Sequence, residues 1–238
     1  MKKIIIVLLF VTLNLRAVDF EFDGGIHFNK PYLFVSLGCN CWQAQALRAH
    51  SLRDAAFPFD WLFTLDNDCL IRCLDEKFKN FFKESYFLRD GSNLENTYYK
   101  FKFTHDWPYG SLPVNAERYQ GQLAFMKVKY TRRIARFDNI RFFKGKVFFM
   151  RCLKTDPNYK GEWGWNAQSA RNLKDALRRF FPELNFTLVI VSCTDKTVSE
   201  IGNIDGVKEY KISDLTAENF KTYKTMFMDL IAEFMPHI

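Results

Sequence analysis

The sequence is poor in the patterns that usually reveal a metal site or a disulfide scaffold. Only four of its 238 residues are histidines, and no pair is spaced as Cys-x-x-Cys or His-x-x-x-His. A structural zinc site is therefore not indicated, and we expect neither a metal nor a cofactor. Six cysteines are too sparse for a disulfide-stapled miniature domain. Cys69 and Cys73, four apart on one predicted helix, are too far apart for a bridge and are expected to pack in the core.

The chain also lacks an apolar run long enough to span a bilayer. The N-terminal run, residues 4–13, has ten residues, whereas a transmembrane helix needs about 20. Two lysines precede this run and Ala17 ends a short segment after it, a pattern typical of an export signal. Leu15 is larger than the residue usual three positions before a cleavage site, so a retained anchor is the alternative. We predict a signal peptide over residues 1–17 of an exported protein, periplasmic or secreted, and one α/β domain over residues 18–238 without a transmembrane span.

The charge pattern gives little support to a nucleic-acid partner. Of the formal net charge of +7, the predicted leader carries three positive charges and no acid, which leaves +4. Residues 127–146 contain eight basic residues and one acid, but apolar residues recur among them at helical spacing, which favours a solvated helix face. Within this stretch, Arg132, Arg133 and Arg136 could together bind an acidic group. Only Arg132 and Arg136, which are four residues apart, share a helix face.

No internal repeat, low-complexity tract or linker interrupts the chain, and its 48% hydrophobic content is enough to form a core. The apolar patterns predict strands at 32–37, 98–103, 146–151, 186–192 and 207–212, and helices at 40–50, 66–82, 115–140, 167–181 and 220–234. This order predicts an α/β fold: a three-layer, Rossmann-like, mostly parallel sheet, with a helical insertion between the first strand and the C-terminal βαβ units. Ligands in such sheets bind beyond the carboxyl ends of the strands.

Cys41 lies where the first predicted strand turns into the first predicted helix. A cysteine in the first helical turn is favoured as a thiolate by the helix dipole, and nearby backbone N–H groups can stabilise an oxyanion. We therefore predict that Cys41 is a nucleophile; the alternative is a small buried packing residue. Asn40, in the same turn, is predicted to contact the substrate.

A cysteine nucleophile needs a base, and His105 is the best placed of the four histidines. It follows a strand-like run, so its imidazole can reach the edge of the sheet. A carboxylate would hold its tautomer, and either Asp106 or Asp60 could supply one. The alternative is a histidine with a purely structural role.

Two further features of the same edge are candidates for substrate binding. Arg151 ends a predicted strand, and its planar guanidinium suits a carboxylate or phosphate; a structural salt bridge is the alternative. The loop 152–166 is long and contains Trp163, so it could form an aromatic wall for a sugar, peptide or nucleobase, or instead fold back over apolar surface.

Several segments together resemble the bacterial family of papain-like cysteine peptidases. They are Ser36-Leu37-Gly38-x-x-Cys41 followed by Ala44, Leu47 and Arg53, then Phe57-Pro58-Phe59-Asp60-Trp61, His105-Asp106, Arg132-Arg133-Ile134-x-Arg136-Phe137, and Phe148-Phe149-Met150-Arg151. The resemblance covers about residues 32–151 and implies a cysteine hydrolase, a peptidase by family, with Cys41 as nucleophile and His105 as base. The predicted order of strands nevertheless indicates a three-layer sheet rather than a helical half beside a barrel.

Residues 38–47 are also similar to the Gly-Asn-Cys-Gln-Ala start of a capsule-polysaccharide acetyltransferase family related to SGNH-type hydrolases, with one extra residue between glycine and cysteine. One thiolate and one oxyanion hole would serve peptide hydrolysis, ester hydrolysis and acyl transfer. We therefore expect a peptide, ester or glycan as substrate. The alternative from a different class is a glycan- or peptide-binding protein without catalysis.

Overall fold

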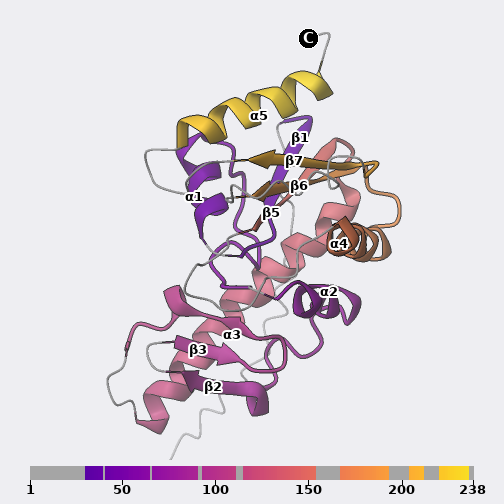
Figure 1. Cartoon of the computed structure of the whole chain (residues 1–238). Coiled ribbons are helices and arrows are strands. Elements are labelled where there is room, and N and C mark those ends of the chain that lie inside the picture. Colours follow the sequence, from indigo (N-terminus) through magenta and orange to yellow (C-terminus); the bar gives the residue numbers. More distant parts are fainter. Residues whose placement is uncertain are drawn as a thin grey trace, which may run out of the picture.

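The larger of the two described sheets is a four-stranded parallel sheet, in the upper half of Figure 1. The computed structural model describes residues 30–39, 41–64, 66–90, 93–110, 115–153, 167–192, 204–211 and 220–235. In spatial order the strands are β1 (Tyr32–Ser36), β5 (Lys146–Leu153), β6 (Phe186–Ser192) and β7 (Val207–Lys211), and each neighbouring pair is parallel. The predicted α/β class and mostly parallel sheet are confirmed.

Side chains alternate between the two faces of this sheet, and helices cover both faces. Val147 and Phe149 of β5 belong to a hydrophobic cluster with α4 (Ala167–Phe180) and with part of α3 (Ala116–Asn139). Phe148 and Met150 belong to a second cluster with α1 (Trp42–Ala49) and α5 (Phe220–Phe234). Figure 1 shows α1 and α5 on the side of the sheet opposite α4, so the molecule has three layers.

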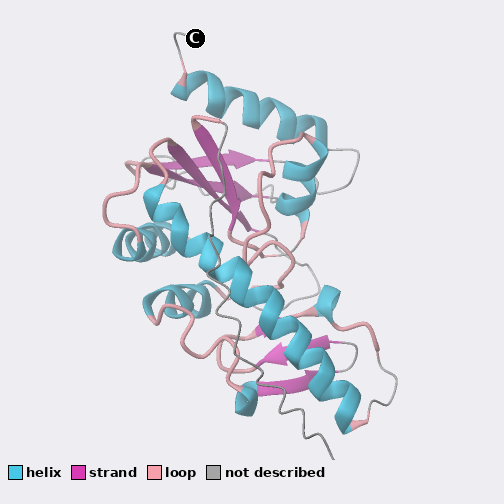
Figure 2. Cartoon of the chain, turned by 180° about the vertical axis from the view of Figure 1, so that it is seen from behind, coloured by secondary structure: helices cyan, strands magenta, loops and turns pink. Residues whose placement is uncertain are grey.

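The insertion between β1 and β5 contains the helices α1, α2 (Asn67–Asp75) and α3, and also a small antiparallel sheet. The strands of this sheet, in spatial order, are β2 (Phe87–Asp90), β3 (Asn93–Asn96) and β4 (Phe101–Lys102). Three short helices belong to the same insertion: η1 (Glu84–Tyr86) before β2, η2 (Thr104–Asp106) after β4, and η3 (Ile140–Phe142) after α3. Figure 2 shows α3 running from the large sheet to the small one. In the described part of the chain, no helix combines the length and the apolar character that crossing a membrane requires.

The helix predicted over residues 66–82 was too long. Helix α2 ends at Asp75, and Lys77 and Phe78 adopt positive φ angles of 49° and 62°. The N–H of Phe78 donates to the carbonyl of Cys73 (2.9 Å) and that of Lys77 to Leu74 (2.9 Å), which is the pattern of a Schellman motif. Because no glycine marks this end, the apolar periodicity suggested a longer helix.

The strand predicted over residues 98–103 was also too long, because only Phe101–Lys102 is strand. Residues 97–100 form a turn in which Lys100 has a φ of 53°. The side chain of Asn96 stabilises the turn by accepting a hydrogen bond from the N–H of Tyr99 (2.9 Å).

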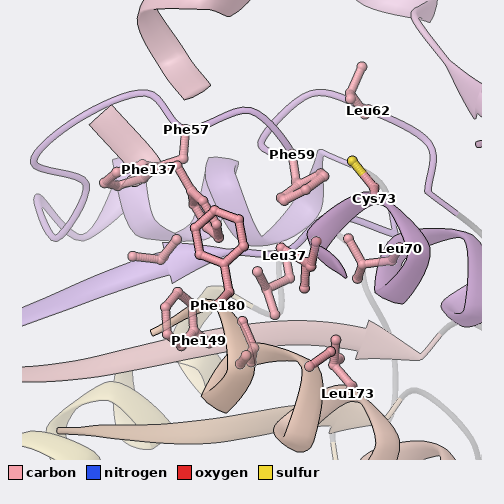
Figure 3. Close-up of a cluster of buried hydrophobic side chains, with 14 of the residues drawn as sticks. Leu37, Phe57, Phe59, Leu62, Leu70, Cys73, Phe137, Phe149, Leu173 and Phe180 are labelled. Carbon is pink, nitrogen blue, oxygen red and sulfur yellow. The ribbon is translucent and has the colours of Figure 1, made fainter. Parts of the chain in front are cut away.

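The loop between α1 and α2 is packed into the core rather than extended over the surface. Phe57 and Phe59 are buried, and the ring of Phe59 contacts Phe137 of α3 with 5.7 Å between centroids. Phe137 in turn contacts Phe180 of α4 at 5.5 Å. Figure 3 shows these rings beside Leu37, at the end of the first strand. This packing holds the loop against the carboxyl edge of β1.

Candidate functional site

The turn after β1 requires unusual backbone angles. Gly38 and Cys39 have φ angles of 77° and 86°, a region in which glycine is favoured and other residues are strained. Cys41 follows as the N-cap of α1, and its carbonyl accepts the first helical hydrogen bond from the N–H of Gln45 (2.9 Å). The predicted order of strand, turn and helix around Cys41 is therefore confirmed, although the helix predicted over residues 40–50 spans only Trp42–Ala49, so that Cys41 precedes its first turn.

The sulfur of Cys41 is partly buried and receives one side-chain hydrogen bond. The donor is Nε2 of Gln45, one helical turn later, at 3.3 Å. Burial raises the pKa of the Cys41 thiol, and a backbone hydrogen bond opposes that shift without overcoming it. This direction runs against the thiolate favoured by the helix dipole, since desolvation disfavours the charged form. The helix start still offers the N–H groups of Gln43 and Ala44, which precede the first helical hydrogen bond.

Thr64 ties this turn to the rest of the molecule. Its hydroxyl oxygen accepts from the N–H of Cys39 (2.9 Å) and from Nη1 of Arg151 (2.6 Å), and the hydroxyl lies 3.4 Å from the carbonyl of Leu37, to which it donates. Its own N–H donates to the carbonyl of Cys39 (3.3 Å). Thr64 is fully buried, so its hydroxyl anchors the turn in the interior of the protein.

Arg151 is 1% exposed and points into the protein rather than into solvent. Besides Thr64 Oγ1, its Nη1 donates to the carbonyl of Leu37 (2.9 Å), and its Nη2 donates to the carbonyl of Thr64. Burial lowers the pKa of its guanidinium. The geometry therefore makes Arg151 a residue that positions the Cys41 turn, closer to the structural role that was the alternative than to the predicted contact with substrate, although its partners are oxygens of Leu37 and Thr64 rather than a carboxylate.

Gln43 fixes the other side of the turn. Its side chain is fully buried, and its amide, in the orientation that satisfies both neighbours, donates to the carbonyl of Gly38 (3.2 Å) and accepts from the N–H of Cys152 (2.6 Å). The start of α1 is thereby bound to the end of β5.

His105 lies in η2 with its side chain exposed. Its ring meets the edge of Trp61, with 5.5 Å between centroids. Within the described ranges, no hydrogen bond joins His105 to Cys41. The two are connected through the backbone instead: Phe63 pairs with Lys102, three residues before His105, and the next residue, Thr64, bonds to Cys39.

The two candidate carboxylates face other partners. Asp106 is buried and accepts from the hydroxyl of Tyr130 (2.6 Å) and from Nζ of Lys129, both on α3. Asp60 is buried as well, and its Oδ2 accepts from Nε (3.0 Å) and Nη2 (2.6 Å) of Arg53. The structure therefore brings neither carboxylate into hydrogen-bond contact with His105. Burial raises the pKa of Asp60, and Arg53 opposes this shift.

Asn40, Trp163 and most of the loop 152–166 lie outside the described residues. Among the residues that are described, no group of three or more His, Cys, Asp or Glu side chains could hold a metal. The described cysteines are all free thiols: Cys39, Cys41, Cys69, Cys73 and Cys152. Cys69 and Cys73 pack in the core, as predicted.

Sequence reasoning missed three residues that shape this site. Gln45 stands four residues after Cys41, a helical spacing that could have identified it as a partner of the sulfur. Arg53 belongs to the motif that carried the family resemblance, but its pairing with Asp60 depends on the loop conformation. Thr64 carries no local signal, because its role comes from contacts with residues far away in the sequence.

A family model matches most of the described sheet and the insertion within it. Residues 32–196 match a family described as putative papain-like cysteine peptidase (DUF1796). The match covers more than half of the chain, from the first residue of β1 past the end of β6, and includes Cys41 and His105. No curated protein and no solved structure matches the chain.

Proposed function

This chain belongs to the putative papain-like cysteine peptidase family, and from that premise we propose that it is a hydrolase in which the sulfur of Cys41 attacks an acyl carbonyl. The observation that carries the proposal is the position of this sulfur. It stands at the N-cap of α1, partly buried, on a strained turn, with an amide donor at 3.3 Å. A cysteine used only for packing needs neither a strained turn nor a polar partner.

Because burial raises the pKa of the Cys41 thiol, the reaction needs a base at the moment of attack. The base removes the proton of the thiol, and the sulfur forms a bond to the carbonyl carbon. The charge that develops on the carbonyl oxygen is stabilised by the N–H groups at the start of α1. The protonated base then supplies a proton to the leaving amine or alcohol, and water hydrolyses the acyl-enzyme. Gln45 stabilises the sulfur while it is negative, since a donor favours the charged form.

We assign the base to His105. His50, the other described histidine, lies at the far end of α1, where its ring packs against Phe227 with 5.8 Å between centroids. His105 is exposed and stands on the segment that pairs with the Cys41 turn. Without a direct hydrogen bond at rest, transfer from Cys41 proceeds through a water or after closure on the substrate, as is common for catalytic pairs before substrate binds.

Hydrolysis of p-nitrophenyl acetate and of a fluorogenic peptide mixture tests the proposal. Cys41→Ser should abolish both activities, and His105→Ala should lower them by about 100-fold, the usual contribution of a positioned base. His50→Ala is the matched control and should leave the rates unchanged. Full activity of Cys41→Ser would refute the nucleophile. Full activity of His105→Ala would refute the base alone.

Alkylation of the intact protein separates reactivity from turnover. Because burial raises the pKa of Cys41, its reaction with iodoacetamide should become faster as the pH rises toward and beyond the ordinary pKa of a cysteine thiol. Gln45→Leu, which removes the hydrogen-bond donor to the sulfur, should shift this pH profile to still higher pH. The buried Cys69 and Cys73 serve as internal controls that stay unlabelled while the protein is folded. Equal labelling of all three would contradict a distinct environment for Cys41.

A further inference from the structure

A cluster of arginines stands beside the loop that leads to Asp60. Arg53 binds the carboxylate of Asp60 through two nitrogens, at 3.0 Å and 2.6 Å. Arg136 of α3 donates from Nη1 to the carbonyl of Ala56 (3.4 Å), and Arg133 lies one turn earlier on the same helix. Of the three arginines considered as a clamp in the sequence, Arg132 is exposed, whereas Arg53, from outside that group, lies close enough to Arg136 to affect its charge.

Positive charge exceeds negative charge in this cluster. Asp60 is paired with Arg53, and the nearby Asp106 is paired with Lys129. Among the residues that the structure describes, neither Arg133 nor Arg136 has a carboxylate within salt-bridge distance. With Asp60 counted against Arg53, the cluster has two positive charges in excess, although Asp60 also attracts Arg133. In agreement, burial and the neighbouring arginines lower the pKa of Arg136.

Arg133 is the buried member of the cluster and has an unmet hydrogen-bond donor. The residue is 7% exposed, and its Nη1 has no hydrogen-bond partner within the described part of the chain. The guanidinium lies over the ring of Tyr130 at 5.0 Å, but the Tyr130 hydroxyl is bound to Asp106. A buried cation with an unsatisfied donor is unfavourable unless an anion completes its surroundings. Arg53 and Arg136 are partly exposed and give such an anion access to the cluster.

We propose that Arg53, Arg133 and Arg136 form a binding site for the phosphate group of a phosphorylated ligand. Two uncompensated charges match a dianion better than a single carboxylate, and guanidinium groups bind phosphate through paired N–H donors. The site also adjoins the candidate base, because Arg53 lies 5.7 Å from the ring centre of Trp61 and His105 lies against the same ring. Phosphate binding at this site does not depend on catalysis. That the phosphorylated ligand is also the substrate would follow only from the proposed hydrolase.

Calorimetry with inorganic phosphate tests the site, with acetate at equal ionic strength as the comparison. The wild type should bind phosphate at least about tenfold more tightly than acetate, because each lost charged contact is worth about that factor. Arg136→Gln should weaken phosphate binding by about tenfold or more, whereas Arg118→Gln, a matched exposed control at the start of the same helix, should change it by less than about twofold. Equal loss in both variants, or equal binding of acetate and phosphate, would overturn the proposal, as would no binding by the wild type.

Thermal unfolding gives a second readout that centres on Arg133. Saturating phosphate should raise the Tm of the wild type by about 5 °C. Arg133→Met, which removes the unpaired cation, should lose this increment while keeping or raising the Tm without phosphate. An unchanged increment in Arg133→Met would refute a role for Arg133. Cys41→Ser should bind phosphate as the wild type does, so failure of the hydrolase proposal and failure of this site are distinguishable.

Discussion

Replacing Thr64 by valine should destabilise the protein strongly, although the two side chains have nearly the same shape. Valine keeps the buried volume but removes the hydroxyl that accepts from the Cys39 N–H and from Arg151, at 2.9 Å and 2.6 Å. Both donors are buried, and neither can turn toward water without movement of the turn. The perturbation therefore isolates polar contacts from packing.

The magnitude follows from the two donors that lose their acceptor. An unsatisfied buried N–H costs about 1–3 kcal/mol, and a charged donor costs more. Arg151 keeps its bonds to the carbonyls of Leu37 and Thr64, which limits its share. We expect a loss of about 3 kcal/mol in the free energy of unfolding. Thr64→Ser, which keeps the hydroxyl and loses one buried methyl group, should cost only about 1 kcal/mol.

Urea denaturation followed by fluorescence measures both variants. With a slope of about 3 kcal/mol per molar urea, Thr64→Val should shift the midpoint by about 1 M. Its Cys41 should also react with iodoacetamide at a changed rate under native conditions, because the turn before it has lost an anchor. If Thr64→Val unfolds at the same urea concentration as Thr64→Ser, the hydroxyl does not hold the turn and the reasoning is refuted.

Three further substitutions test other parts of the structure by the same denaturation assay. Gly38→Ala should lower the free energy of unfolding more than its control Gly110→Ala. Both glycines have positive φ, but a Cβ at Gly38 would lie 2.5 Å from the hydroxyl of Thr64, whereas a Cβ at Gly110 would have no atom within 4 Å. Equal costs would show that backbone strain alone matters. Asp66→Ala removes the N-cap of α2, which accepts a backbone N–H at 3.1 Å, and should cost about 1 kcal/mol near neutral pH. Burial alone would raise the pKa of Asp66, but its hydrogen bonds have the larger effect and lower the pKa. The contribution of the N-cap to stability is therefore present above about pH 4 and disappears as the pH falls further. A difference in stability between wild type and Asp66→Ala that persists in acid would contradict this reasoning. Tyr130→Phe leaves Asp106 without its buried hydroxyl donor, at 2.6 Å, and should cost about 2 kcal/mol, while a loss below about 0.5 kcal/mol would make that bond unimportant.

Three strands of the large sheet, β1, β5 and β6, could be predicted because each is a short, largely apolar run, whereas in β7 apolar Val207 and Tyr210 are separated by charged residues. Residues 186–192 are buried at every position and were predicted with their observed bounds. Strand β1 was predicted one residue too long. Helix α3 combines an apolar stripe with Asn115 as its N-cap, whose side chain accepts from Arg118 N–H (2.9 Å), so its start was also recognisable.

The small sheet was harder to predict because its strands have two to four residues and little alternation. Their pairing depends on the turn at residues 97–100 and on contacts of Asn96, whose amide donates to the carbonyls of Asn80 (3.0 Å) and Phe81 (3.1 Å). Contacts of this kind join distant segments and leave no periodic signal in the sequence.

For the site, local context was sufficient only where the chemistry is local. The position of Cys41 follows from one strand and one helix, and it was predicted correctly. The partner of His105 could not be found in this way, because Asp106, its neighbour in sequence, points toward Tyr130 and Lys129 instead. Likewise, only the folded loop shows that Arg151 reaches inward to Thr64.

Helix α3 packs against both sheets and joins them into one folding unit. Its 24 residues extend about 36 Å, and its buried side chains belong to one continuous hydrophobic cluster that contains residues of both sheets, among them Leu94 of β3 and Val147 of β5. Deleting the small sheet would therefore expose apolar side chains of α3, the same helix that packs against the large sheet. Calorimetric melting of the intact chain should accordingly be a single cooperative event, and a fragment ending before residue 116 should not hold its shape alone.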